Sequence, residues 1–88
     1  MAEATGITVT QLQGYAGKSE CLVEATSSAT ETITLNGDNN GEVVTTIKSV
    51  SAHVAATGVA VVYAYANNVL TRTTAGTDVA DVIRVVYE

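Results

Sequence analysis

Short segments in which apolar and polar residues alternate recur along the chain. Residues 7–12, ITVTQL, alternate from their first position, and residues 82–88, VIRVVYE, place Ile83, Val85 and Tyr87 on one side. A period of two residues is typical of a β-strand with one buried face. The pattern therefore predicts strands rather than helices in both segments.

The same pattern predicts further short strands between these two. Asn67 and Asn68 stand between two alternating segments, where we expect a two-residue hairpin turn because Asn tolerates a positive φ. Whether residues 50–54 continue the preceding strand or form a separate one, the pattern leaves open. In all we expect six or seven short strands, drawn from residues 7–12, 21–25, 31–35, 42–56, 59–66, 69–74 and 82–88.

Composition supports this interpretation. Of the 88 residues, 14 are Val, 14 are Thr and four are Ile, and β-branched side chains favour pleated sheets over helices. The length allows one core. We therefore expect an all-β fold, a small single-domain antiparallel β-sandwich or barrel over residues 7–88, with residues 1–6 as a flexible N-terminal arm.

The expected core is thin. The chain has no Phe and no Trp, and its single cysteine, Cys21, excludes an internal disulfide. We interpret Cys21 as a small buried hydrophobic residue. The chain also has no Pro and few charges to protect its edge strands. Both features favour association with other chains, so we expect a homo-oligomer.

The charge disfavours two classes of partner. The formal net charge is −5, and the four basic residues, Lys18, Lys48, Arg72 and Arg84, are scattered in the sequence. A nucleic acid or an anionic membrane requires several cations on one face. No export signal and no apolar run long enough to span a bilayer are visible, so we expect synthesis in the cytoplasm.

One polar segment, residues 36–42 (NGDNNGE), has the residue types of a cation site. Asp38, Asn40 and Glu42 alternate there, and their oxygens could face one calcium ion. An EF-hand loop, however, requires Glu where this chain has Ser49, and helices on both sides. We interpret the segment as a turn between strands and expect no metal.

No catalytic pattern accompanies it. His53 is the single histidine, no G-x-S-x-G or phosphate-binding glycine motif occurs, and no cation lies beside Cys21 to lower its pKa. We therefore expect neither enzymatic activity nor a cofactor.

The C-terminal half, however, resembles a known class of proteins. The segments NNVLTRTTAGTDVAD, residues 67–81, and VIRVVYE, residues 82–88, are similar to the ends of small bacteriophage head decoration, or capsid cement, proteins. Glu88 replaces the more familiar final Gly, and the N-terminal half carries no matching motif. The resemblance implies a virion protein that binds the major capsid protein on the outer capsid surface as a trimer and stabilises the shell by bridging capsomers.

The expected interface combines the arm with aromatic residues, because an arm can add a strand to a capsid sheet and Tyr suits interfaces. We expect deletion of residues 1–6 to leave the fold intact and to weaken attachment. The alternatives are a tail-tube, head-completion or fibre component, and a carbohydrate- or cell-surface-binding module. The expected interface residues are Met1, Ala2, Glu3, Ala4, Thr5, Gly6, Ile7, Tyr63, Tyr65 and Tyr87.

Overall fold

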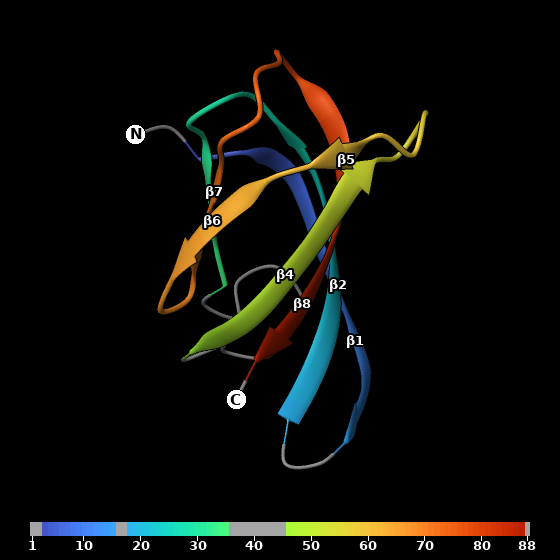
Figure 1. Cartoon of the computed structure of the whole chain (residues 1–88), viewed down its shortest axis with the longest axis vertical. Coiled ribbons are helices and arrows are strands. Elements are labelled where there is room, and N and C mark those ends of the chain that lie inside the picture. Colours follow the sequence, from blue (N-terminus) through green and yellow to red (C-terminus); the bar gives the residue numbers. More distant parts are fainter. Residues whose placement is uncertain (1–2, 16–17, 36–45, 88) are drawn as a thin grey trace.

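The computed structural model describes residues 3–15, 18–35 and 46–87, and these residues form two antiparallel sheets without a helix (Figure 1). The predicted all-β fold is confirmed. None of the described residues forms a helix long and apolar enough to cross a membrane. The strands are β1 (Thr5–Tyr15), β2 (Lys18–Ser27), β3 (Thr32–Thr34), β4 (Ile47–Val54), β5 (Ala60–Val61), β6 (Tyr63–Ala66), β7 (Val69–Arg72) and β8 (Val79–Tyr87).

The larger sheet has the strand order β1-β2-β8-β4-β5, and the smaller has the order β3-β7-β6. Strand β8 lies at the centre of the larger sheet, paired with β2 on one side and β4 on the other. Its inward residues Ile83, Val85 and Tyr87 are buried, as the alternation predicts.

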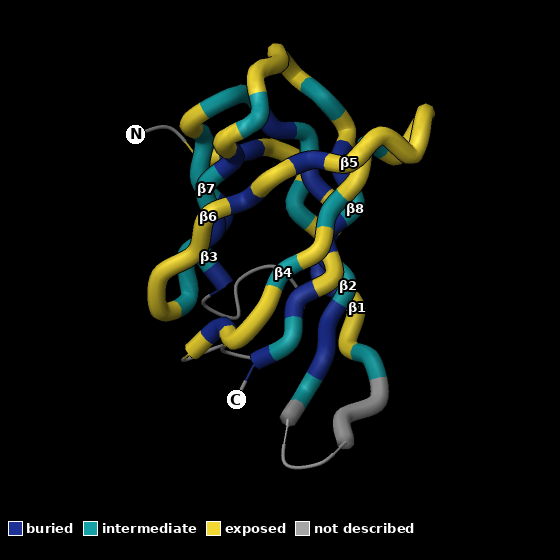
Figure 2. The backbone as a smooth tube through the Cα atoms, viewed as in Figure 1, coloured by how far each residue is buried: buried dark blue, intermediate teal, exposed yellow. Residues whose placement is uncertain are grey.

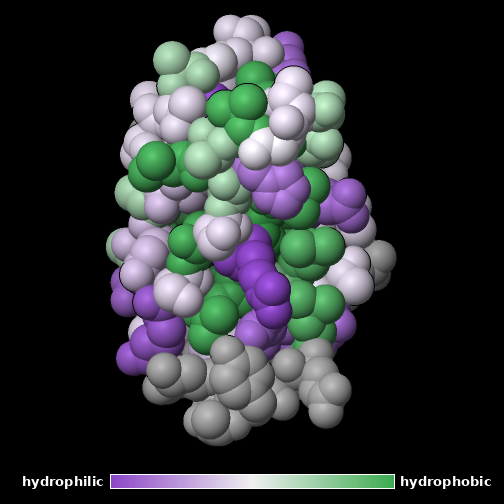
Figure 3. All heavy atoms as spheres, turned by 45° about the vertical axis from the view of Figure 1, so that its right-hand side comes forward, coloured by the Kyte–Doolittle hydropathy of each residue, from purple (hydrophilic) through white to green (hydrophobic). Residues whose placement is uncertain are grey.

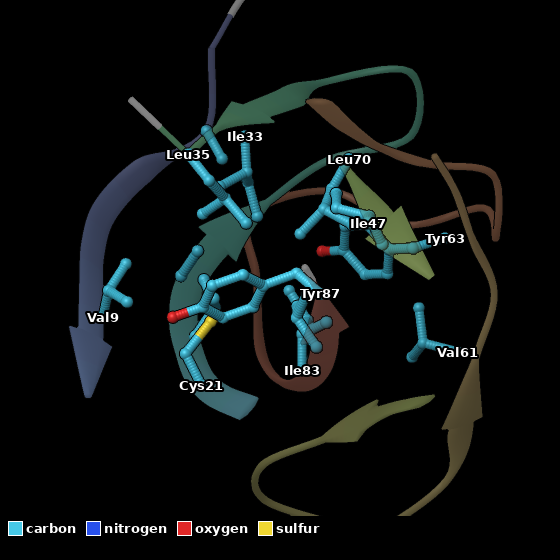
Figure 4. Packing of buried hydrophobic residues seen from close by; sticks show 14 residues of the cluster. Val9, Cys21, Ile33, Leu35, Ile47, Val61, Tyr63, Leu70, Ile83 and Tyr87 are labelled. Carbon is cyan, nitrogen blue, oxygen red and sulfur yellow. The ribbon is translucent and has the colours of Figure 1, made fainter. Parts of the chain in front are cut away.

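The core lies between the two sheets, as Figure 4 shows. Cys21, Ile33 and Leu35 are buried there, which confirms the predicted inward face of residues 31–35 and the interpretation of Cys21. Figure 2 shows that burial alternates with exposure along most strands. The remaining buried apolar residues are Ala4, Val9, Val23, Ala25, Ile47, Val61, Tyr63, Leu70, Ile83, Val85 and Tyr87.

The chain crosses between the sheets at Val62. Strand β5 pairs with β4 in the larger sheet, whereas β6 pairs with β7 in the smaller one. Between them, the Val62 N–H donates to Oγ1 of Thr74 over 2.9 Å, so it makes no ladder bond. The prediction of one unbroken strand over residues 59–66 is therefore wrong, because this segment forms a corner.

A second crossing lies near Gly6, at the opposite edge. Glu3 forms a parallel bridge with Thr32 in β3, and the Ala4 N–H donates to the Thr32 carbonyl over 2.8 Å. Beyond Gly6, whose φ is +60°, β1 pairs with β2. A register shift between Thr5 and Thr8 marks the bend, as bulges do at sheet corners.

These contacts correct the expected arm. Ala4 is buried in the core and Thr5 begins β1, so residues 3–6 belong to the folded domain rather than to a flexible arm. Residues 1 and 2 lie outside the described residues. With corners at Gly6 and Val62, the two sheets are joined on both sides, which gives the sandwich a barrel-like form.

The structure tests two local predictions, the hairpin turn at Asn67 and the strand boundary near residue 50. Asn67 has a φ of +55° and lies in a two-residue hairpin closed by the Ala66–Val69 pair, as predicted. Residues 47–54 form the single strand β4, which answers the question that the pattern left open. Residues 36–42, which we interpret as a turn between strands, lie outside the described residues.

Candidate functional site

The described residues contain no cluster that suggests metal chemistry. Among residues 3–15, 18–35 and 46–87, no three His, Cys, Asp or Glu side chains lie close enough to hold one metal ion. His53 is exposed on β4, where its cross-strand neighbours are Val82 and Ala60. The remaining candidates for a functional site are buried polar groups and the surface.

One buried polar network connects the sheets. Tyr63 in β6 donates from its hydroxyl to Oδ2 of Asp81 in β8 over 2.6 Å. Arg72 in β7 donates from Nε to the same oxygen over 2.8 Å. The Arg72 and Asp81 side chains are 2% and 0% exposed. The triad Tyr63–Arg72–Asp81 thus places an ion pair and a phenol between the layers.

Burial determines the protonation state of the triad and its access to a ligand. Burial raises the pKa of the Tyr63 phenol well above its ordinary value of 10.0, and the hydrogen bond to Asp81 raises it further. Tyr63 therefore remains a neutral donor over the physiological pH range. Because the ion pair is almost completely buried, the triad orders and joins the sheets rather than meeting a ligand.

The connection between β7 and β8 covers the triad. Nη1 of Arg72 donates to the Thr74 carbonyl, and a Cβ atom built on Gly76 would lie 2.7 Å from the same Nη1. Only glycine lets the backbone approach the guanidinium this closely. The connection of residues 73–78 thus packs closely over the ion pair as well as joining the two strands.

Sequence reasoning missed this triad, although a signal for it exists. Arg72 shares its strand face with buried Leu70, and Asp81 shares its face with buried Ile83. Two opposite charges on inward positions of adjacent strands in the sequence indicate a buried ion pair, because an unpaired buried charge is costly.

Two of the three tyrosines expected at the interface lie inside the domain. Tyr63 is 6% and Tyr87 is 3% exposed, and the Tyr87 hydroxyl donates to Oε1 of Gln11 over 2.8 Å. The alternation identified their strand face correctly, but that face is the core. Tyr65 is 44% exposed, and its hydroxyl donates to the Lys48 carbonyl. Of these three rings, Tyr65 alone offers substantial area to a partner.

The N-terminal residues expected at the interface are already occupied by the domain itself. Glu3 accepts hydrogen bonds from the Thr34 N–H over 2.8 Å and from the Thr32 hydroxyl over 2.9 Å. These bonds attach residues 3 and 4 along the edge of β3. Thr5 and Gly6 are exposed, and Ile7 is half-buried against the core. Met1 and Ala2 lie outside the described residues.

The surface feature that stands out is the segment Val59 to Ala66. Strands that alternate usually carry polar residues outward, yet both faces of this segment are apolar apart from the tyrosine hydroxyls. Among the described residues, the exposed large hydrophobic side chains are Val59, Val62 and Tyr65. We call the exposed side chains of this segment the β5–β6 surface; they are Val59, Ala60, Val62, Ala64, Tyr65 and Ala66.

The distribution of charge also sets this segment apart from the rest of the chain. Residues 49–71 contain no Asp, Glu, Lys or Arg, although the chain as a whole carries nine acidic and four basic residues. Elsewhere, apolar and polar side chains are interspersed: the face in Figure 3 shows hydrophobic side chains (green) on both sides of a hydrophilic strip (purple). On the outer face of the larger sheet, Arg84 pairs with Glu20, whose oxygen lies 2.6 Å from Nη2.

Backbone contacts hold the β5–β6 surface in place. The Val62 carbonyl accepts from the Thr73 N–H and from its hydroxyl, both over 2.9 Å. The Val54 N–H donates to the Val59 carbonyl over 2.8 Å and closes the β4–β5 hairpin. An apolar surface fixed in this way loses little conformational entropy when it binds. Its exposed side chains are apolar apart from the Tyr65 hydroxyl.

Comparisons of this chain with protein-family models, with curated proteins and with solved structures found no significant match.

Proposed function

We propose that this chain is a non-enzymatic structural protein of a virus particle, which binds the outer surface of the capsid and stabilises the shell by bridging capsomers. The observation that carries the proposal is the β5–β6 surface. A strand segment that is apolar on both faces is typical of a strand covered on both faces, yet within this segment the domain covers only Val61 and Tyr63. The resemblance of residues 67–88 to capsid decoration proteins suggests which partner covers the exposed side chains.

The size and chemistry of this surface fit a repeated, individually weak contact. Apolar area removed from water contributes about 25 cal/mol per Å², and six mostly small side chains supply a limited area. On a capsid, however, one oligomer meets several equivalent sites at once. Linked contacts raise the overall affinity by about 10²–10⁴ without any new interaction. Any oligomer of this chain, the trimer that the resemblance implies included, would use this gain.

The interior of the domain suits a protein that has to resist force. Tyr63 and Arg72 flank the β5–β6 surface within the smaller sheet, and both bond to Asp81 in the larger one. A force applied at the surface therefore reaches the central strand β8 through buried charge-assisted hydrogen bonds, which are stronger than neutral ones. A protein that holds capsomers together requires such a connection.

The proposal can be tested with capsids assembled from the major capsid protein of the same virus. Co-sedimentation would compare the wild-type protein with Val62→Asp, because Val62 is 63% exposed at the centre of the surface. We expect Val62→Asp to abolish binding and Val62→Thr, which keeps the shape, to weaken it. The matched control is Ser51→Asp, which adds the same charge at an exposed position of β4.

Ala64→Asp serves as a second surface variant. Circular dichroism would confirm that each variant is folded. Equal binding by Val62→Asp and the wild-type protein would contradict the proposed surface. Electron microscopy of the decorated particles would then test the location. Density on hexamers and pentamers supports decoration, whereas density on a tail, or specific binding to a glycan array without capsid binding, rejects it in favour of another role.

A further inference from the structure

We propose that β1 pairs with β1 of a second copy of this chain, in antiparallel orientation, to form a two-fold symmetric dimer with one continuous sheet. The feature behind this inference is an unprotected edge. Strand β1 is the terminal strand of the larger sheet, so alternate residues direct their N–H and C=O groups away from β2. The inference concerns the isolated protein and does not depend on capsid binding.

The other terminal strands of the two sheets, among the described residues, are short. Strand β3 has three residues, and Glu3 and Ala4 lie along it. Strands β5 and β6 have two and four residues and meet at the Val62 corner. Strand β1 has 11 residues. Among the described residues it is thus the longest terminal strand of either sheet, and long, regular edges are those that pair between molecules.

The sequence of β1 lacks the residues that prevent such pairing. Monomeric β-proteins protect edges with Lys, other charges, Pro or bulges. From Thr5 to Tyr15 there is no charged residue and no Pro. Register shifts lie near both ends, between Thr5 and Thr8 and between Leu12 and Tyr15. Residues 8–12 between them pair regularly with β2, so the middle of the edge offers an undistorted template.

A second copy fits this template better than a charged partner does. Antiparallel self-pairing centred on Thr10 places Thr10 opposite its own copy and Thr8 opposite Leu12. No like charges meet, although each chain carries a net charge of −5. The nearest acidic residues along this edge, Glu20 and Glu24, are in β2.

Distance keeps these acidic residues from opposing the dimer. The β2 strands of the two copies would be separated by three inter-strand spacings, about 14 Å. That distance exceeds the Debye length of about 8 Å at physiological ionic strength, so their repulsion is largely screened. Self-association through β1 should therefore strengthen as salt is added, because the remaining long-range repulsion falls.

The experiment is sedimentation equilibrium of the isolated protein at low and high salt over a wide concentration range. We expect a dimer that strengthens with salt. Thr10→Lys, at an exposed position of β1, should weaken association by about tenfold or more, because two Lys residues would face each other. Ser51→Lys on the interior strand β4 adds the same charge and should associate as the wild-type protein does.

Hydrogen exchange of the wild-type protein gives a readout that needs no variant. The outward amides within residues 8–12 should exchange more slowly as the protein concentration rises. A monomer under all conditions, a trimer unaffected by Thr10→Lys, or exchange in residues 8–12 that does not depend on concentration would each overturn the proposal. Capsid binding measured by co-sedimentation can succeed or fail independently of these outcomes.

Discussion

Tyr63 and Asp81 join the two sheets of this domain: the Tyr63 hydroxyl in the smaller sheet donates a 2.6 Å hydrogen bond to Oδ2 of Asp81 in the larger one. Arg72 donates to the same oxygen over 2.8 Å. All three side chains are buried. Because a buried carboxylate requires partners, the stability of the sandwich depends on these three residues as a unit.

Replacing Asp81 should be strongly destabilising. Asp81→Asn leaves the Arg72 guanidinium buried without its anion, and we expect the free energy of unfolding to fall by about 3–5 kcal/mol. Urea denaturation would measure this free energy. Asp78→Asn makes the same chemical change at an exposed position and should alter stability by less than about 0.5 kcal/mol.

A double variant tests the cause. Arg72→Met combined with Asp81→Leu removes both buried charges and should recover much of the loss, because neither charge is then left unpaired. A single variant Asp81→Asn as stable as the wild-type protein would show that the ion pair does not support the fold.

The phenol of Tyr63 should make the domain sensitive to alkaline pH. Burial raises the pKa of Tyr63 in the folded state above its ordinary value of 10.0. Above pH 10 the unfolded chain releases this proton while the folded chain keeps it, so stability falls with rising pH, by about 1.4 kcal/mol per pH unit. Below pH 10 the contribution is fully present.

Tyr63→Phe isolates this effect. At neutral pH the variant should be less stable by about 1–2 kcal/mol, because Asp81 loses a hydrogen bond. The difference between the wild-type protein and the variant should shrink above pH 10, as urea denaturation at several pH values would show. A difference that stays constant up to pH 11 would mean that Tyr63 ionises in the folded state with an ordinary pKa.

Gly76 should tolerate no side chain. In Gly76→Ala the new Cβ would lie 2.7 Å from Nη1 of Arg72 and 2.9 Å from Cγ2 of Val79, which should cost about 1–3 kcal/mol. Gly58→Ala is the matched control, since no atom lies within 4 Å and its φ of +74° costs about 1 kcal/mol. Thermal unfolding would rank them, and equal melting temperatures would indicate that the cover over Arg72 is not closely packed.

The N-terminal attachment should contribute measurably to stability. Glu3→Ala removes the acceptor of the Thr32 hydroxyl and the Thr34 N–H, and we expect a loss of about 1 kcal/mol. Glu24→Ala removes an exposed carboxylate from β2 as a control. Chemical denaturation would compare them. Deleting residues 1–6 should cost more, contrary to the sequence-based expectation, because Ala4 is buried.

Much of the secondary structure could be predicted from the sequence. The alternation at residues 7–12, 31–35 and 82–88 gave the strands and their inward faces, and Asn67 indicated the hairpin. These features are local, because the side chains of a strand alternate between two faces wherever the strand lies. The all-β class followed from the many β-branched residues.

The prediction of the interface residues, unlike that of the strands, depended on long-range structure. Alternation assigned Tyr63 and Tyr87 to one face of their strands, but it could not tell whether that face was the core. Only the packing of the second sheet decided that both rings are buried. The exposure of Val62 has the same origin, because the chain leaves one sheet there and enters the other.

By itself, then, the sequence determined most of the strands, their inward faces, the turn at Asn67 and the absence of charge from residues 49–71. The tertiary structure decided the corners at Gly6 and Val62 and the meeting of Arg72 with Asp81. The physical reason is that a strand's pattern specifies which side is buried, whereas the partner that buries it is chosen by pairing between segments far apart in the chain.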